Sequence, residues 1–250
     1  MTGILVSIVT IAYNAQTSIE NTIQSVISQQ YPHIEYIIID GASTDNTLGI
    51  VNKYKKNIDI IISEKDRGIS DAFNKGIRCA HGDLIMFLNA GDTVVDENIV
   101  NKVVSDWEQN KSDILFYKVK IGEHTFQPTD NYGDNGNKIW DECHIPHQGA
   151  FVRREVFDMV GNFNICLKTR MDYDFWARCR NMKCSYLYIP EAIVEYEVGG
   201  TSMQISNAKC FYQEGLGIKL IYGLRISLID IVQLLMPQFI RRIIRNFISR

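Results

Sequence analysis

The sequence lacks features that would point to several common classes of protein. It has 26 Lys and Arg against 29 Asp and Glu, so it shows no basic excess of the kind that nucleic-acid-binding domains carry. Its six cysteines include no Cys-x-x-Cys pair. No run of about 18 apolar residues occurs, and the N-terminus enters a predicted strand without the features of a signal peptide. These absences favour a cytosolic protein with reduced thiols.

The length and the periodicity of the chain predict its organisation. A chain of 250 residues suits one large domain, or one domain with an appendage. Its first half alternates β-rich and helical patterns, which predicts βαβ units and a mostly parallel sheet flanked by helices. The expected strands are residues 6–11, 36–39, 58–62 and 84–88. The expected helices follow Thr17, Thr47 and Ile69, and Thr17 with Glu20 has the spacing of a capping box.

The stretch from Asp83 to Asp92 is the predicted centre of the sheet. Its apolar part, Leu84 to Leu88, shows no alternation with polar residues, which is typical of a strand covered on both faces. The tip that follows is small and acidic, and it is expected at the carboxyl edge of the sheet, where α/β proteins bind ligands. A carboxylate at Asp92 is placed to approach a metal-bound diphosphate.

The loop after the first strand reads Ala12-Tyr-Asn-Ala15, so the common nucleotide-binding motifs are missing there. Without a Gly-x-Gly-x-x-Gly turn, NAD(P) or FAD on a Rossmann fold is disfavoured, and a Walker loop is absent too. What remains is a nucleotide held by side chains, with its diphosphate neutralised by Mg²⁺ or Mn²⁺.

Four segments carry a resemblance to a known family. They are Val6-Ser-Ile-Val-Thr-Ile-Ala-Tyr-Asn14, Ile39-Asp-Gly-Ala-Ser-Thr-Asp-Asn-Thr47, Asp66-Arg-Gly-Ile-Ser-Asp-Ala-Phe-Asn-Lys-Gly76 and Phe87-Leu-Asn-Ala-Gly-Asp92. In order and spacing they resemble the family 2 glycosyltransferases of the GT-A fold, over roughly residues 4–205. They look most like the bacterial branch that builds capsule, O-antigen or colanic-acid type polysaccharides.

The resemblance implies a set of residues that bind the nucleotide and the donor sugar. Tyr13 is expected to pack on the base and Asp40 to accept a hydrogen bond from it, with Thr10 facing the nucleoside. The remaining residues expected on the donor side are Asn14, Asp66, Asp71, Asn74, Lys75, Asn89 and Gly91. Of these, Asn89 and Gly91 stand where many relatives have carboxylates, so Asp92 is left as the expected metal ligand, for Mn²⁺ or Mg²⁺.

The second half is expected to supply the acceptor side and the base. His147, Gln148 and Trp176 are assigned by resemblance to the sugar or acceptor pocket. Asp172 is the expected base that deprotonates the acceptor hydroxyl, and Asp174 is the alternative. One of these two acids is expected to cap the helix that starts there. Lys75 or Arg178 is a candidate to balance charge on the leaving group.

Other interpretations of these residues are more ordinary. Asp40 and Asp92 could simply end strands, and Asp71, Asn74 and Lys75 could form a solvated helix face. Cys143, His144 and His147 could suggest zinc, but the chain offers no second ligand pair with suitable spacing.

The C-terminal stretch, residues 217–250, is apolar and helical in pattern. Ile240, Ile243, Ile244, Phe247 and Ile248 form a stripe opposite Arg241, Arg242 and Arg245. Such a helix can lie on an anionic membrane, which would place the protein on the inner face of the plasma membrane. The alternative is a helix that folds back onto the domain or pairs with another subunit.

The expected protein is therefore a GT-A-like glycosyltransferase with a C-terminal helical extension. The domain is expected over 1–210, with a nucleotide-binding half (1–100) and an acceptor half (101–210), and the extension over 211–250. It would move a sugar from a nucleotide-sugar, expected to be a UDP-sugar, to a saccharide or polyprenyl-diphosphate-linked acceptor, with inversion. The other hypotheses are a catalytically silent sugar-nucleotide-binding or scaffold protein, a nucleotidyltransferase and an NAD-linked sugar enzyme.

Overall fold

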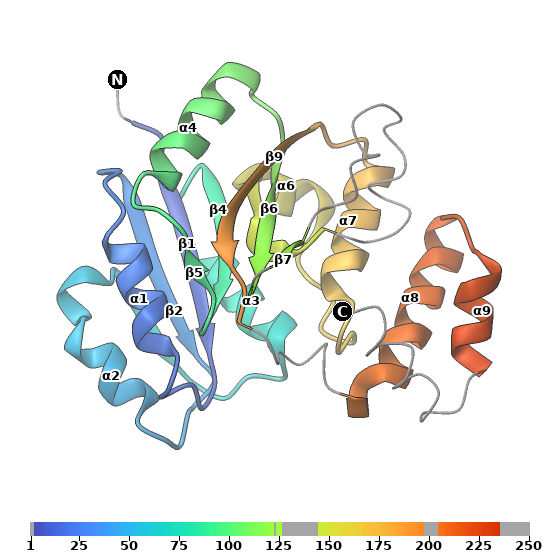
Figure 1. Ribbon diagram of the computed structural model, residues 1–250, viewed down its shortest axis with the longest axis horizontal. Coiled ribbons are helices and arrows are strands. Elements are labelled where there is room, and N and C mark those ends of the chain that lie inside the picture. Colours follow the sequence, from blue (N-terminus) through green and yellow to red (C-terminus); the bar gives the residue numbers. More distant parts are fainter. Residues whose placement is uncertain (1–2, 123, 127–144, 198–204, 236–250) are drawn as a thin grey trace.

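A nine-stranded sheet forms the centre of the protein (Figure 1). The computed structural model describes residues 3–122, 124–126, 145–197 and 205–235. Within this part the strand order is β3-β2-β1-β4-β8-β6-β9-β5, with β7 paired to β6. The strands are β1 (Val6–Ala12), β2 (Ile34–Asp40), β3 (Ile60–Ser63), β4 (Leu84–Asn89), β5 (Thr93–Val94), β6 (Ile114–Ile121), β7 (His124–Phe126), β8 (Ala150–Arg153) and β9 (Tyr186–Glu195).

The first four strands of that order, β3, β2, β1 and β4, are parallel throughout. Leu84 to Leu88 of β4 are buried, as their continuous apolar pattern predicts for a strand covered on both faces. The register pairs Ala12 with Asp40 and Ile11 with Asn89. The loops that leave β1, β2 and β4 therefore meet at one edge of the sheet.

The other half of the sheet is mixed. β8 runs antiparallel to both β4 and β6, whereas β9 is parallel to β6 and antiparallel to the short strand β5. Because β5 directly follows the tip after β4, its pairing with β9 brings the end of β9 to the same edge. The α/β fold class predicted from the sequence is confirmed.

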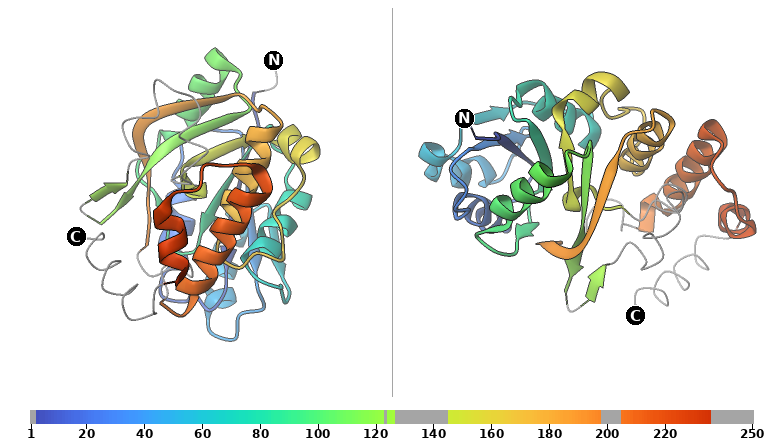
Figure 2. Two further views of the ribbon diagram at one scale, coloured as in Figure 1. Left: turned by 90° about the vertical axis from the view of Figure 1, so that its right-hand side faces the viewer. Right: turned by 90° about the horizontal axis from the view of Figure 1, so that it is seen from above.

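Helices cover both faces of the sheet (Figure 2). One face packs against α1 (Ile19–Ile27), α2 (Thr47–Lys53) and α4 (Ile99–Asn110), and the other against α3 (Ile69–Cys79), α6 (Arg154–Val160) and α7 (Met171–Asn181). In α1, the spacing of Ile19, Ile23 and Val26 puts all three on the buried stripe. Each such side chain contributes about 1.5–3 kcal/mol through burial.

The capping box expected at Thr17 and Glu20 does not form. Helix α1 begins at Ile19 after Ser18, and no side chain caps its first turn. Glu20 instead accepts a hydrogen bond from the Tyr54 hydroxyl at 2.8 Å. Contact between α1 and the end of α2 outweighs the local cap.

Two C-terminal helices, α8 (Ala208–Tyr222) and α9 (Leu228–Leu235), lie at the end of the molecule away from α1 and α2, with α8 beside α7 and α9 beside α8 (Figures 1 and 2). Ile218 and Leu224 pack against Tyr173 and Ala177 of α7. The expected boundary between residues 210 and 211 falls inside α8, and the stripe 240–248 lies outside the described residues. None of the helices in the described part combines the length and the hydropathy that crossing a bilayer requires.

Candidate active site

The loops after β1 and β2 meet around Gly41. A Cβ atom on Gly41 would lie 3.3 Å from Cδ2 of Tyr13 and 2.6 Å from Oδ2 of Asp66. The Tyr13 ring is 65% exposed, which is unusual for a large aromatic side chain and leaves its face free for a flat ligand. Tyr13 and Asp66 therefore both lie next to Gly41 at the sheet edge.

Asn14 joins these two loops. It has a positive φ of 49°, and its side-chain oxygen accepts a hydrogen bond from the Thr44 N–H at 2.9 Å. Its own N–H donates to the Ser43 hydroxyl at 2.8 Å. Asn14 thus holds the loop that carries Tyr13 in place.

Asp40 is placed differently from the expectation that it meets the base directly. Its side chain has no exposed surface, and its carboxylate accepts hydrogen bonds from the backbone and hydroxyl of Ser43 and from the Ser63 hydroxyl. Asp40 therefore fixes the turn that carries Gly41, and the accessible carboxylate next to Tyr13 is that of Asp66.

Thr10 and Trp176 lie in the interior rather than at the edge. Thr10 is fully buried, with its hydroxyl 3.2 Å from that of Tyr36. Trp176 is 2% exposed, and its ring N–H donates to the Ile145 carbonyl at 3.2 Å. The expectations that Thr10 faces the nucleoside and that Trp176 lines the acceptor pocket are corrected on this ground.

Asp71 and Lys75 are anchored to the loop that precedes α3. Asp71 accepts a hydrogen bond from the Arg67 N–H at 3.0 Å. The Lys75 ammonium donates to the Lys65 carbonyl at 2.9 Å and pairs with the Glu64 carboxylate at 3.2 Å. Both side chains brace the segment around Asp66, so neither points freely toward a donor as the sequence suggested.

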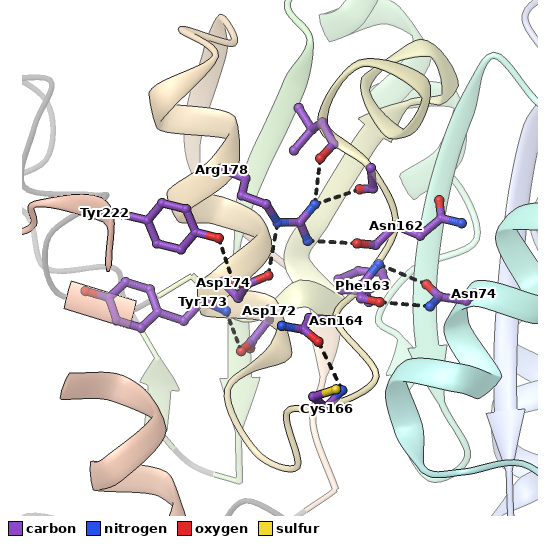
Figure 3. A network of polar contacts seen from close by, with 12 residues as sticks. Asn74, Asn162, Phe163, Asn164, Cys166, Asp172, Tyr173, Asp174, Arg178 and Tyr222 are labelled. Atoms are coloured by element: carbon purple, nitrogen blue, oxygen red, sulfur yellow. Dashed lines mark hydrogen bonds and ion pairs between the residues drawn. The ribbon is translucent and has the colours of Figure 1, made fainter. Parts of the chain in front are cut away.

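Asn74 also has an internal role (Figure 3). Its amide nitrogen donates to the Phe163 carbonyl, and its amide oxygen accepts from the Phe163 N–H, both at 2.9 Å. This two-point clamp joins α3 to the loop before α7 and uses both ends of the amide. The expectation that Asn74 faces the donor is corrected.

Asp92 follows β4 in a closed environment. It is 2% exposed, and its carboxylate accepts hydrogen bonds from the Asn89 N–H at 3.3 Å, the Gln148 amide at 3.1 Å and the Glu197 N–H at 3.0 Å. Burial raises the pKa of the Asp92 carboxyl, although these hydrogen bonds and nearby His147 act in the opposite direction. Gln148, expected in the sugar pocket, thus braces Asp92.

His147 bridges Asn89 and Asp172. Nε2 of His147 lies 3.2 Å from the Asn89 amide nitrogen, and Nδ1 lies 3.8 Å from Oδ2 of Asp172. Since the amide nitrogen can only donate, Nε2 is the acceptor of this contact, and Nδ1 is the ring nitrogen that faces Asp172. The acid expected as base therefore belongs to the same cluster as the tip of β4.

Asp174, the alternative base, is enclosed in an ion-pair network (Figure 3). Its oxygens accept hydrogen bonds from Nε of Arg178 and from the Tyr222 hydroxyl, both at 3.0 Å. Arg178 also donates to the carbonyls of Val160, Gly161 and Asn162, which leaves it no part in balancing a leaving group. Asp174 is thereby removed from the site.

The start of α7 is capped from α8, and neither Asp172 nor Asp174 is its cap. The Glu214 carboxylate accepts hydrogen bonds from the N–H groups of Lys168, Thr169 and Arg170, at 2.7 to 3.0 Å. Sequence analysis missed Glu214 because no motif marks it. It fixes the turn from which Asp172 projects.

Glu197 is a second residue that the sequence did not reveal. Gly91 has φ 107°, and a Cβ atom there would overlap the Glu197 carboxylate. Thr93 pairs with Glu195 in an antiparallel ladder. Two residues beyond this pair, Gly91 therefore comes to lie opposite Glu197, which explains the contact. The only sequence signal for it is the glycine itself.

The side chains at this tip offer too few ligands to hold a divalent cation alone, so a bound diphosphate would have to supply the others. In the described ranges, no three His, Cys, Asp or Glu side chains gather into a metal site. Oδ1 of Asp92 accepts a single N–H and so retains a lone pair, and the Asn89 side-chain oxygen is buried without a hydrogen-bond partner. These are hard oxygen donors, which suit Mg²⁺ or Mn²⁺ shared with phosphate oxygens.

The chain is similar in sequence to known proteins. The family model described as glycosyl transferase family 2 matches residues 7–165. A PGL/p-HBAD biosynthesis glycosyltransferase from Mycobacterium bovis is 28% identical over 211 residues, which make up 82% of each chain.

Solved structures share the fold. S. aureus TarS in complex with UDP-GlcNAc superposes with a TM-score of 0.73 at 19% identity, over 92% of this chain and 69% of that chain. The mannosyltransferase PcManGT from Pyrobaculum calidifontis, in complex with GDP-Man and Mn²⁺, gives 0.70 at 17% identity, over 94% and 73%. The protein is a glycosyltransferase with the GT-A fold, and it belongs to glycosyl transferase family 2.

Proposed function

We propose that this enzyme transfers a sugar from a UDP-sugar to a saccharide acceptor with inversion at the anomeric carbon. The observation that carries the proposal is the cluster of Asp172, His147, Asn89 and Asp92 at the edge that also carries Tyr13. One acid there is accessible enough to act as a base, and another is held next to the strand end where a diphosphate would lie.

Tyr13, Gly41 and Asp66 form the proposed base subsite. The exposed Tyr13 ring can stack on a uracil, and the Asp66 carboxylate can accept its imide N–H. Asn14 would support this subsite by fixing the Tyr13 loop. The UDP and UDP-GlcNAc complexes of TarS, a protein of the same fold, support a uridine nucleotide.

Asp172 is the proposed base. As the acceptor oxygen bonds to the anomeric carbon, the bond from that carbon to the diphosphate oxygen breaks, and the hydroxyl proton passes to the Asp172 carboxylate. A single displacement of this kind inverts the configuration, so α-linked donors would give β-linked products. General-base catalysis of this kind contributes roughly 10²–10⁴-fold to the rate.

Asp92 and Asn89 would hold the divalent cation, Mn²⁺ or Mg²⁺. When bound, such an ion neutralises the charge that develops on the departing nucleoside diphosphate. The Mn²⁺ present in the PcManGT complex supports this choice. The backbone N–H of Gly91 donates to the Thr22 hydroxyl at 2.8 Å, and this hydrogen bond would hold the backbone of the tip in its conformation.

The proposed acceptor is a polyprenyl-diphosphate-linked saccharide, in cell-surface glycan synthesis on the cytoplasmic side of the membrane. The exposed apolar residues Leu220, Ile221, Leu228 and Ile231 on α8 and α9 support peripheral contact with a lipid surface. Relatives named for PGL/p-HBAD biosynthesis and for teichuronic acid biosynthesis support the pathway. Removal of residues from Gly223 onward is expected to shift the protein from membranes to the soluble fraction.

The test is a panel of nucleotide-sugars with Mn²⁺ or Mg²⁺ and lipid-linked acceptors, with release of free nucleotide as the signal. Transfer by the wild type and its loss in Asp172→Asn support the proposal. NMR of the product should show inversion, and retention would refute the single-base mechanism. Binding of UDP without any turnover would favour the silent binding protein instead.

A further inference from the structure

The position of Glu197 against Gly91 has a chemical consequence. The chain has no side chain at residue 91, and the space beside its Cα is filled by the carboxylate of Glu197, two residues after the end of β9. Gly91 has φ 107°, a conformation that a side-chain-bearing residue rarely adopts. An acid at this point of the tip therefore comes from the segment that follows β9 and not from the loop after β4.

The backbone keeps Glu197 in this place. Its N–H donates to Oδ1 of Asp92 at 3.0 Å, and the antiparallel pairing of Thr93 with Glu195 anchors the preceding residues. Glu197 and Asp92 are 105 positions apart in the sequence, yet both border Gly91. Because the hydrogen bond uses the N–H, the Glu197 carboxylate remains available.

The charge of Glu197 is not balanced by a basic side chain. Glu191 and Glu195 of β9 form ion pairs with Lys102 and Lys120, at 3.1 and 3.9 Å. Among the residues that the structure describes, no Lys or Arg forms such a pair with Glu197. A carboxylate beside Gly91 and Asp92, without a cationic partner, presents oxygen donors that suit a hard divalent cation.

We infer that the Glu197 carboxylate, which lies beside Gly91 and Asp92, is a ligand of the divalent cation that accompanies the nucleotide diphosphate. The inference rests on the proposed function, since the diphosphate supplies the remaining ligands. It makes Glu197, together with Asp92, a determinant of cation affinity in this chain.

The experiment measures Mn²⁺ binding to the full chain, with and without UDP, from the loss of the free Mn²⁺ signal in electron paramagnetic resonance. Glu197→Gln keeps the backbone hydrogen bond to Asp92 and removes only the charge. It is expected to weaken Mn²⁺ binding in the presence of UDP by at least about tenfold. Glu195→Gln, two residues earlier at the end of β9, is the matched control and should bind Mn²⁺ like the wild type.

Each outcome decides the inference separately from the proposed function. Unchanged Mn²⁺ affinity in Glu197→Gln would overturn the inference, and so would a wild type that binds UDP but no Mn²⁺. Unfolding curves of both variants check that the tip stays folded. A wild type that binds no nucleotide at all would instead reject the proposed function.

Discussion

Oδ2 of Asp172 faces Nδ1 of His147 at 3.8 Å, and the opposite ring nitrogen of His147 contacts Asn89. This distance is too long for a direct hydrogen bond, so His147 lies beside the carboxylate without consuming a lone pair of Oδ2. The side chains of His147 and Asp172 are 12% and 23% exposed, which leaves Asp172 the more accessible of the two. An acid held in this way is suited to receive a proton from an incoming hydroxyl.

Asp172→Asn should therefore lower kcat by about 10²–10⁴-fold, because the amide cannot accept the proton. The KM for the donor should change little, since the base subsite lies at Tyr13. Steady-state kinetics of nucleotide release measures both. Asp158→Asn, an exposed acid on α6, is the matched control. A kcat within threefold of the wild type would exclude Asp172 as the base.

Asp174→Asn should mainly lower the free energy of unfolding. The change removes a charge that accepts hydrogen bonds from Arg178 and Tyr222, and hydrogen bonds to charged groups contribute about 1.5–3 kcal/mol. Urea denaturation should show a loss of that size, whereas Asp172→Asn should unfold like the wild type. Equal unfolding free energies for the two variants would contradict the separate roles assigned to these neighbouring acids.

The parallel half of the sheet and its edge could be predicted from the sequence, because both follow from local patterns. A continuous apolar run predicts a strand buried on both faces, and parallel strands bring their carboxyl ends together. Tyr13, Asp92 and Asp172 lie directly at such ends or at a helix start. Local patterns were sufficient to place these three residues in the fold, whereas their expected roles came from the family resemblance and stay predictions.

Residues whose partners are distant in sequence could not be predicted in this way. Asn74 bonds to Phe163, 89 positions away, so its helical position says nothing about which loop packs on it. Glu197 reaches Gly91 only through the pairing of β5 with β9, and β5 contains two residues, too few for a pattern. Motif matching likewise fails to separate a residue that binds a ligand from one that braces it, as Asp40 and Lys75 illustrate.

Tyr13→Ala should weaken UDP binding. Stacking of an aromatic side chain on a base contributes about 1–3 kcal/mol, which corresponds to roughly 5- to 150-fold in Kd. Tyr13→Phe keeps the ring and should bind within about threefold of the wild type. Isothermal titration with UDP measures both, and an unchanged Kd in Tyr13→Ala would remove Tyr13 from the base subsite.

Asn74→Ala should destabilise the fold by leaving the buried N–H and carbonyl of Phe163 without partners. Each unpaired group costs about 1–3 kcal/mol, although water entry into the gap would reduce the total. The midpoint of urea unfolding measures the loss. Asn101→Ala, at an exposed position of α4, should stay within about 0.5 kcal/mol of the wild type. Similar midpoints for the two variants would argue against the clamp.

Glu214 should make the docking of α8 on α7 dependent on pH. Burial alone would raise the pKa of its carboxyl, but the hydrogen bonds from Lys168, Thr169 and Cys210 outweigh it and lower the pKa below 4.5. Since the folded pKa is the lower one, the stabilisation is fully present above the ordinary value and is lost as pH falls through the folded pKa.

Glu214→Gln should therefore cost about 1–2 kcal/mol at pH 7, a range reduced from that for charged hydrogen bonds because the site is partly exposed to solvent. The difference from the wild type should shrink as the pH falls below the folded pKa, where the wild-type carboxyl is also neutral. Urea unfolding at several pH values measures this, with Glu108→Gln on α4 as an exposed control. A difference that is the same at pH 7 and in acid would mean that Glu214 stabilises the turn by packing and not by its charge, because only the charged form accepts strong hydrogen bonds from three consecutive backbone N–H groups.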